Sequence, residues 1–259
     1  MVLGTVEYPN PILLSQVEGR NPVHETLKRG GVRKLMVLNG SEGDPRVKDI
    51  LALARRRGAP VEMVTKEELD RASQTGRHQG VIALVEAPGY ASLGSVVAKA
   101  GRAPCVLILD GVQDPQNLGS ILRTADATGV DAILIPKQES VGLTPAVLRV
   151  SMGARVPVAR ENLYPAVKLL KDEGFRIIAV DMSGDRDYWD EDLSAAVALV
   201  LGGEGEGISP TLLGKCDAVI RIPMTGQVTS LNVGVSAAVV LYERQRQIKV
   251  TLRRSSRPT

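Results

Sequence analysis

The sequence predicts an α/β fold built on a mostly parallel sheet, with two units, and three observations lead to it. Short apolar runs alternate with helical segments along most of the chain, a pattern typical of βαβ crossover units. Runs in the second half, such as Val106-Leu-Ile-Leu109, are apolar at every position, as in parallel strands covered on both faces. A stretch rich in turn residues at 87–103 separates a smaller N-terminal unit from a larger C-terminal one.

The N-terminal unit begins with a helix at 19–30, because a Pro stands near its first turn and a Gly at its end. The alternation continues with strands at 34–38, 61–65 and 81–86 and with helices at 44–58 and 66–73.

The C-terminal unit resumes the alternation after a possible short helix at 92–100. Continuous apolar runs predict strands at 105–110, 132–136, 176–181, 198–202 and 218–222. The segments that follow them predict helices at 117–128, 144–152, 163–173, 209–216 and 231–247. Small and branched apolar residues fill much of the last helix, so we expect it to be largely buried.

Composition excludes several classes of protein. The chain has 259 residues, 44% of them apolar, and no uncharged apolar run of membrane-spanning length. Met1–Asn10 lacks the basic start and apolar core of a secretory signal. Cys105 and Cys216 lie in or beside apolar runs, which favours buried thiols in a reducing cytoplasm. Neither they nor His24 and His78 have metal-ligand spacing, so no metal is expected.

The net charge of +3 is unevenly distributed. Residues 1–103 hold 15 Lys and Arg against 11 Asp and Glu, whereas residues 104–243 hold 11 against 18. Residues 244–259 hold 6 basic residues and no acidic one. If the ligand is a nucleic acid, its phosphates should be attracted mainly by the N-terminal part and the C-terminal tail. The alternative for the tail is a solvated chain terminus with no role in binding.

The first segment that points to chemistry is Leu109–Gly129. A strand ends at Asp110, a polar turn broken by Pro follows, and a helix begins near Asn117 and carries Arg123 about two turns later. This arrangement places an amide and a cation at the carboxyl edge of a sheet, where open α/β folds bind ligands.

Two later segments are rich in loop residues. Gly202-Gly-Glu-Gly-Glu-Gly207 follows a strand, and its glycines let a ligand approach the backbone. It has no P-loop lysine and no dinucleotide fingerprint, so the alternative is a structural loop with two solvated glutamates. Ile222–Asn232 is an extended loop in which Ser230 is a plausible helix N-cap. Asn232, in the first turn, is better explained by a polar contact.

Together the three segments resemble the SpoU (TrmH-type) branch of the SPOUT RNA methyltransferases. The resemblance lies in Asp114-Pro-Gln-Asn-Leu-Gly119 with Arg123, Leu201-Gly-Gly-Glu-Gly-Glu-Gly-Ile208, and Ile222-Pro-Met224 with Ser230-Leu-Asn232. Gly19-Arg-Asn-Pro-Val23 and Gly76-Arg-His-Gln-Gly-Val-Ile82 resemble the RNA-binding domain, similar in fold to ribosomal protein L30e, of bacterial 23S rRNA guanosine 2′-O-methyltransferases in this branch. The expected organisation is an N-terminal extension at 1–14, an L30e-like domain at 15–86, a linker at 87–103, a methyltransferase domain at 104–249 and a basic tail at 250–259.

The resemblance implies a C-terminal trefoil knot, S-adenosylmethionine as cofactor, and methyl transfer to a ribose 2′-hydroxyl. The residues that it places at the cofactor are Gly202, Gly203, Ile222, Met224, Ser230 and Leu231. The residues that it places at the reaction are Arg123, Asn117, Glu204, Ser230 and Asn232. A guanidinium stays protonated, so we favour Arg123 as a phosphate anchor and stabiliser of the developing alkoxide, although a role as base remains open.

The resemblance also implies an RNA partner and a homodimer in which each site is completed by the partner subunit. Arg20, Arg77 and His78 are the candidate RNA-binding residues, together with the Arg55–Arg57 run. The alternative for that run is a helix C-terminus that favours cations. The leading substrate is a guanosine of 23S rRNA. A tRNA or another rRNA ribose is the alternative within the same class, and a non-catalytic RNA-binding or ribosome-assembly factor is the alternative outside it.

Overall fold

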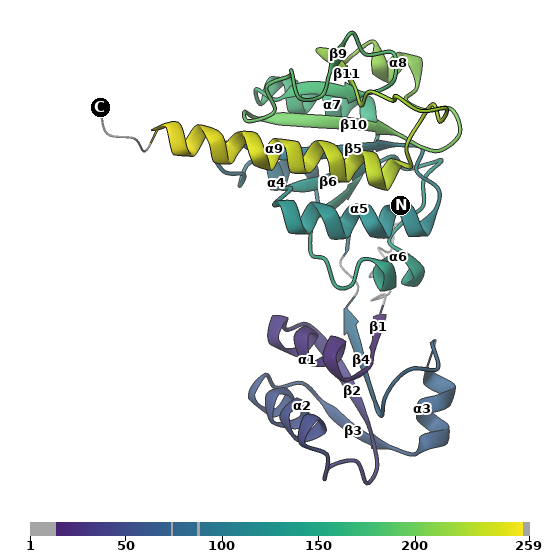
Figure 1. Cartoon of the computed structure of the whole chain (residues 1–259). Helices are drawn as coiled ribbons and strands as arrows, with labels where there is room; N and C mark the ends of the chain where they lie inside the picture. Colours follow the sequence, from purple (N-terminus) through teal and green to yellow (C-terminus); the bar gives the residue numbers. More distant parts are fainter. Residues whose placement is uncertain (1–13, 74, 87–88, 256–259) are drawn as a thin grey trace, which may run out of the picture. The chain divides into compact units, whose positions relative to one another are not determined.

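The computed structural model describes residues 14–73, 75–86 and 89–255, which fall into two compact units (Figure 1). The first unit spans Met1–Ala87 and the second Pro88–Thr259. The expected N-terminal extension therefore lies outside the described residues up to position 13, and Leu14 already belongs to the first strand.

The first unit is built on a four-stranded sheet in the order β1-β4-β2-β3. Its strands are β1 (Leu14–Glu18), β2 (Val32–Leu38), β3 (Val61–Val64) and β4 (Val81–Glu86). Only β2 and β3 are parallel, whereas β4 runs antiparallel to both β1 and β2. The prediction of a mostly parallel sheet is therefore wrong for this unit. An apolar run indicates a strand but not its direction, which depends on the end of the sheet at which the chain re-enters it.

Three helices cover this sheet: α1 (Arg20–Arg29), α2 (Pro45–Arg56) and α3 (Lys66–Ala72). Asp44 caps α2 by accepting from the Arg46 amide at 2.9 Å, and Thr65 and Glu68 form a capping box on α3. Apolar residues of α1 and α2 pack in one core cluster with β2 and β4, while Leu69 of α3 packs in a separate one with Val64 and Ile82.

The second unit holds a seven-stranded sheet in the order β7-β6-β5-β10-β8-β11-β9, and every pairing in it is parallel. Its strands are β5 (Cys105–Asp110), β6 (Ala132–Ile135), β7 (Val158–Arg160), β8 (Arg176–Val180), β9 (Arg186–Asp187), β10 (Val197–Gly202) and β11 (Ala218–Arg221). The mostly parallel sheet is confirmed here, and the five predicted strands match to within one residue at each end. β7 and β9 were not predicted, because runs of three and two residues carry no periodicity.

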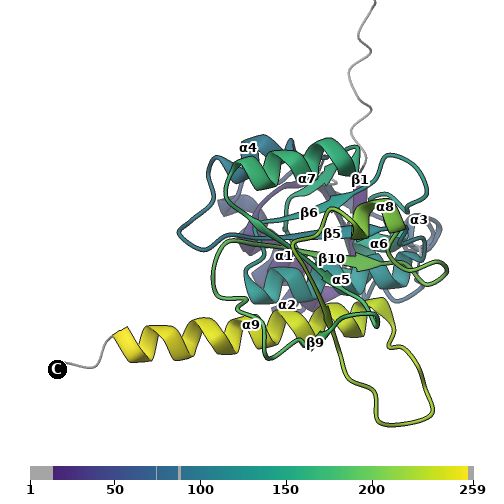
Figure 2. The ribbon, with the colours of Figure 1, turned by 90° about the horizontal axis from the view of Figure 1, so that it is seen from above.

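Helices lie on both faces of this sheet, as Figure 2 shows with α4 and α7 on one side and α9 on the other. They are α4 (Leu93–Val97), α5 (Pro115–Thr128), α6 (Pro145–Val150), α7 (Leu163–Asp172), α8 (Pro210–Leu213) and α9 (Val233–Ser255). β5 and β10 at the centre are buried along almost their whole length, which explains their continuous apolar sequence.

The segment expected to be a linker is largely part of the second unit. Leu93 is fully buried in its core, its amide donates to Glu161 Oε1 at 2.9 Å, and the Ala91 amide donates to the Val158 carbonyl. The contacts therefore place the junction at 87–88, before α4.

The last helix differs from its predicted bounds at both ends. It begins at Val233 rather than 231 and continues to Ser255 rather than 247. The expected basic tail at 250–259 is thus helical through residue 255, and residues 256–259 lie outside the described part. Among the described residues, no helix has the length and apolarity to cross a membrane, and no group of three or more His, Cys, Asp or Glu side chains could hold a metal.

Both cysteines are free thiols, as predicted, and burial raises the pKa of each. Cys105 is completely buried and its pKa is about 12, while Cys216 is partly buried and its pKa is about 11. An unfolded thiol has a pKa of about 8.5. The stabilisation from keeping these thiols neutral is therefore complete below that pH and is lost as the pH rises toward the folded values.

At pH 8 a thiol reagent should label Cys105 only after denaturation. It should label Cys216 in the native protein roughly 10²-fold more slowly than free cysteine, because the thiolate is the reactive form. Mass spectrometry after timed alkylation measures both rates. Rapid labelling of native Cys105 would contradict its burial.

Candidate active site

A cavity of about 400 Å³ lies at the carboxyl ends of β8 and β10 and beside the loop after β11. Its walls come from residues that are far apart in the sequence: Val180, Asp181, Met182, Leu201, Gly202, Gly203, Glu204, Gly205, Gly207, Ile222, Met224, Ser230, Leu231, Asn232, Val233 and Ser236. The carboxyl edge of a parallel sheet is where open α/β folds bind ligands, as expected from the sequence. The size falls within the range of small-molecule sites.

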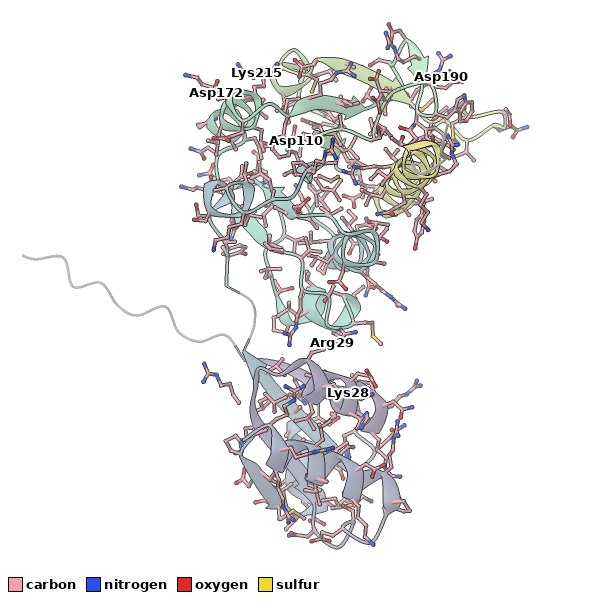
Figure 3. The ribbon with its side chains drawn as sticks, turned by 90° about the vertical axis from the view of Figure 1, so that its left-hand side faces the viewer. Lys28, Arg29, Asp110, Asp172, Asp190 and Lys215 are labelled. Carbon is pink, nitrogen blue, oxygen red and sulfur yellow. The ribbon has the colours of Figure 1, made fainter. Side chains whose placement is uncertain are left out.

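The glycine-rich loop after β10 is packed too tightly for any side chain at two positions. A Cβ on Gly202 would overlap the backbone of Gly207, and a Cβ on Gly203 would overlap the carbonyl of Gly111. Asp110, the last residue of β5, is labelled in Figure 3. It binds both ends of this loop: its carbonyl accepts from the Gly203 amide at 2.7 Å and its carboxylate from the Ser209 amide at 2.9 Å. The first motif segment therefore fixes the shape of the second.

A chain of side-chain hydrogen bonds joins all three motif segments. Asn117, only 7% exposed, donates from Nδ2 to the carboxylate of Glu204 and accepts from Asn232 Nδ2 at 2.8 Å. Asn232 Oδ1 in turn accepts from the amides of Gly234 at 2.9 Å and Val235 at 3.4 Å. These contacts fix the orientation of the side-chain amides of Asn117 and Asn232. Because Glu204 accepts from Asn117, the alternative of a loop with two solvated glutamates does not hold for this residue.

The N-cap of α9 is Asn232, and the prediction that assigned this role to Ser230 is wrong. The Asn232 carbonyl accepts the first helical hydrogen bond, from the Ser236 amide, while its side chain caps Gly234 and Val235. Asn is as good a cap as Ser. Its additional contact with Asn117 places the helix start two residues later than expected and confirms that Asn232 makes a polar contact.

The cavity brings together most of the residues expected at the site. All six expected at the cofactor line it, and so do Glu204, Ser230 and Asn232, with Asn117 hydrogen-bonded to two of these three. Arg123 does not line it. Its side chain is exposed on α5, and within the part of the chain that the structure describes it makes no hydrogen bond or ion pair.

Sequence reasoning missed the wall supplied by β8. Asp181 directly follows that strand, and its Oδ1 accepts from the amide and the hydroxyl of Ser183 at 2.9 and 2.7 Å. The available signal was a polar residue at the end of the strand predicted at 176–181. The neighbouring Met182 is 46% exposed and also lines the cavity.

The three candidate RNA-binding residues of the first unit differ in their surroundings. Arg20 donates to the Gln79 carbonyl at 3.1 Å and pairs with Asp44 at 2.8 Å, and His78 contacts Asp70 at 2.8 Å. Arg77 is exposed, and its guanidinium has no partner among the described residues.

The Arg55–Arg57 run forms the exposed C-terminal end of α2, as in the alternative interpretation of this run. There the Arg57 guanidinium donates to the Lys28 carbonyl of α1.

Comparison with known proteins identifies relatives along almost the whole chain. The SpoU rRNA methylase family model matches residues 104–242, and the model for RNA 2′-O ribose methyltransferase substrate binding matches residues 16–91. A Bacillus subtilis (strain 168) protein named as a TrmH family tRNA/rRNA methyltransferase, YacO, is 41% identical over 239 residues, which cover 89% of this chain and 95% of the relative.

Two solved structures are similar in fold over both units. The AdoMet-bound rRNA methyltransferase from Sinorhizobium meliloti is 27% identical with a TM-score of 0.75, and the alignment covers 91% of this chain and 88% of that one. The SpoU methyltransferase AviRb from Streptomyces viridochromogenes, in complex with AdoMet, is 25% identical with a TM-score of 0.76 over 90% of each chain. From the family match and the identity to its relatives, the chain belongs to the SpoU rRNA methylase family and is an RNA methyltransferase.

Proposed function

We propose that this chain transfers a methyl group from S-adenosylmethionine to the 2′-hydroxyl of an RNA ribose, with a guanosine of 23S rRNA as the substrate. The observation that carries the proposal is the single cavity at which the second and third motif segments meet, joined by side chains to the first. Two solved relatives are described as bound to AdoMet.

The residues of the cavity suit an adenosine group. Backbone groups of Gly202 and Gly203 can bind the polar edge of a base, while Ile222, Met224 and Leu231 supply apolar cover for its faces. When bound, S-adenosylmethionine supplies an electrophilic methyl group on a sulfonium.

The side chains of this protein then orient the attacking ribose and stabilise its charge. The 2′-oxygen must approach in line while its proton passes to solvent, so the chain has to fix the position of that oxygen. Asn117, itself bound by Asn232, holds Glu204 at the cavity wall, where its carboxylate orients the substrate or Arg123. Arg123 stabilises the developing alkoxide electrostatically, since a guanidinium remains protonated.

We also propose a homodimer in which Arg123 of one subunit completes the cavity of the other. Arg123 lies outside the cavity of its own chain, exposed on α5, which packs against α9. Apolar side chains are exposed on α9 and on the loop before it: Val228 at 65%, Leu231 at 37%, Val235 at 48% and Tyr242 at 58%. Such a patch beside a site suits a protein interface.

The proposed fold includes the trefoil knot in the second unit and an L30e-like RNA-binding domain in the first. In support of the knot, backbone segments cross closely: a Cβ on Gly184 would lie 2.6 Å from the Ile220 carbonyl carbon and 2.8 Å from the Arg221 nitrogen. In support of the RNA-binding domain, the substrate-binding family model covers the first unit. An RNA substrate and two free thiols, one of them buried, suit a cytoplasmic protein.

The substrate can be tested by mapping 2′-O-methyl groups in rRNA and tRNA from cells with and without the gene. We expect one 23S rRNA guanosine to lose its methyl group and to regain it when the wild-type gene is restored, but not when an Arg123→Ala variant is supplied. Loss confined to tRNA would establish the tRNA alternative, which the tRNA/rRNA name of the Bacillus relative keeps open. No lost methyl group in either RNA would contradict the proposal.

A further inference from the structure

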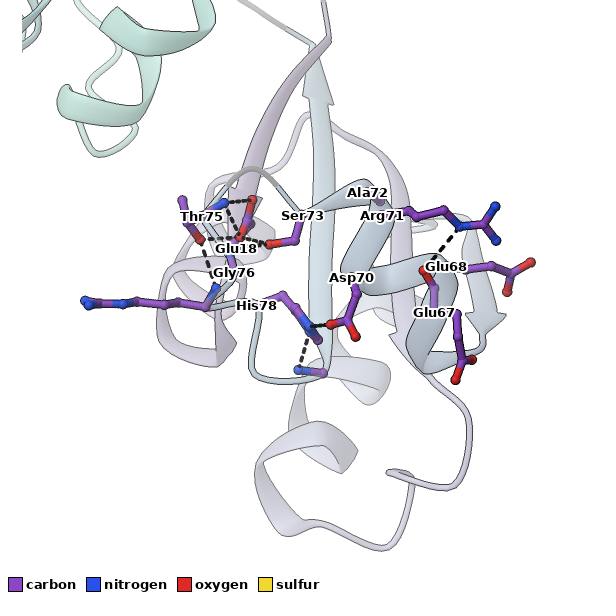
Figure 4. A network of polar contacts seen from close by, with 12 residues as sticks. Glu18, Glu67, Glu68, Asp70, Arg71, Ala72, Ser73, Thr75, Gly76 and His78 are labelled. Carbon is purple, nitrogen blue, oxygen red and sulfur yellow. Dashed lines mark hydrogen bonds and ion pairs between the residues drawn. The ribbon is translucent and has the colours of Figure 1, made fainter.

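A carboxylate in the first unit organises the loop that carries Arg77 (Figure 4). Glu18 stands at the end of β1 and accepts from the Ser73 hydroxyl at 2.7 Å, from the Thr75 hydroxyl and from the Thr75 amide at 3.3 Å. Gln16 Nε2 donates to the same carboxylate at 2.9 Å. Four donors from the described residues therefore converge on one partly buried side chain.

The same two hydroxyls also accept hydrogen bonds from backbone amides of the loop. Each hydroxyl has one proton, which it donates to Glu18, so its lone pairs remain available as acceptors. The Gly76 amide donates to Ser73 Oγ at 2.9 Å, and the Arg77 amide donates to Thr75 Oγ1 at 3.2 Å. The carboxylate thus determines the backbone conformation at Arg77 through two intermediates.

The other end of the Thr75–Gly80 loop is held separately. His78 contacts Asp70 through Nε2 at 2.8 Å and accepts the Gly80 amide through Nδ1 at 3.0 Å. Gln79 has a φ of 52°, in the left-handed region, and its side chain accepts from the Arg20 amide at 3.1 Å. With both ends of the loop anchored, Arg77 is the cation that it presents to solvent.

We propose that Glu18 is a positioning residue for RNA binding, which holds the Thr75–Gly80 loop so that Arg77 contacts an RNA phosphate. The inference rests on the proposed function and refines it: Arg77 binds RNA directly, whereas Arg20 and His78 hold the loop. When the loop backbone is already held, less of the chain has to be ordered for the Arg77 guanidinium to bind a phosphate.

The direction in which one substitution changes the affinity for RNA distinguishes positioning from long-range electrostatics. Glu18→Ala removes a negative charge from an RNA-binding unit, so long-range electrostatics alone predicts tighter binding. Positioning predicts weaker binding. Glu62→Ala is the matched control, because it removes the same charge from a carboxylate that pairs with Lys34 on β2.

The full-length protein is titrated by filter binding with an unmodified 23S rRNA transcript over a series of KCl concentrations. We expect Arg77→Ala to weaken binding about tenfold and to reduce the salt slope by about 1. Glu18→Ala should weaken binding by a similar factor and also reduce the slope. The double variant should bind within about twofold of Arg77→Ala alone, because both act on one contact. Glu62→Ala should bind as the wild type does or more tightly.

Two further measurements distinguish positioning from unfolding. Glu18→Gln keeps an acceptor for the hydroxyls and should recover part of the affinity, with a wild-type melting temperature. In methyl-transfer assays, KM for RNA should rise while kcat and the affinity for S-adenosylmethionine stay constant.

Glu18 variants that bind as Glu62→Ala does, or whose effect multiplies with that of Arg77→Ala, would overturn the inference. A wild-type protein that binds neither this transcript nor a tRNA transcript would refute the proposed function itself and the inference with it.

Discussion

Arg123→Ala is expected to lower the rate of methyl transfer by a factor of about 10² to 10³ while leaving the affinity for S-adenosylmethionine unchanged. The loss corresponds to removing one charged donor that stabilises the developing alkoxide. The affinity should not change because Arg123 is proposed to act on the attacking ribose and is not one of the residues that line the cofactor cavity. Single-turnover transfer of a labelled methyl group and calorimetric titration with the cofactor measure the two quantities.

Two substitutions serve as controls for this result. Arg149→Ala removes the same charge from an exposed arginine of α6 and should keep the wild-type rate. Arg123→Lys keeps the charge but loses the planar fork, so it should recover part of the rate if charge stabilisation dominates. An Arg123→Ala enzyme with normal turnover would eliminate any catalytic role for this residue.

Gly203→Ala is expected to weaken S-adenosylmethionine binding at least about 100-fold and to lower the melting temperature by several degrees. The added Cβ would overlap the Gly111 carbonyl, which is backbone and cannot rotate away. The loop would have to move away from β5, and the Gly203 amide would lose its bond to the Asp110 carbonyl. Calorimetric titration and thermal unfolding measure the two effects.

The same loop offers a closely matched control. Gly205→Ala introduces the identical methyl group two residues later, where nothing lies within 4 Å of the new Cβ. This variant should bind the cofactor and melt as the wild type does. Equal behaviour of the two variants, whether both harmless or both damaging, would show that the crossing at Gly111 is not what shapes the cavity.

Mixed dimers of these two variants test whether Arg123 acts across the proposed interface. A dimer of one Arg123→Ala subunit and one Gly203→Ala subunit would contain one site with an intact cavity and an intact arginine from the partner. After subunit exchange, half of the dimers are mixed, so about a quarter of the wild-type activity should return. No recovery would place Arg123 in the site of its own chain.

Local patterns were sufficient to predict five of the seven strands of the second unit. The central strands are apolar at every position because both faces are covered, which is a signal that the sequence displays directly. The six residues expected at the cofactor came from the family resemblance, and all of them meet at one cavity. The sheet of the first unit was harder to predict, because the direction of β4 depends on how the chain connects β3 to β4, and no local pattern of residues indicates that.

Other features depended on partners that are distant in the chain. Ser230 and Asn232 are both residue types that cap helices well. Asn232 is the one that caps α9, and it also contacts Asn117, 115 residues earlier. Asp181 became a wall of the cavity only because β8 lies beside β10. Among Arg20, Arg77 and His78, residue type alone could not indicate which side chains hold the loop and which one faces solvent.

The sequence alone determined the family, the alternation of elements in the second unit and the residue types that surround the site, because each depends on short-range patterns or on motifs of fixed spacing. Only the tertiary structure decided how those residues are used. It joined Glu204, Asn117 and Asn232 into one oriented chain, placed Arg123 outside its own cavity and made Glu18 the anchor of the Arg77 loop. Hydrogen bonds and close backbone contacts between segments far apart in the chain depend on three-dimensional proximity, which no local pattern of residues encodes.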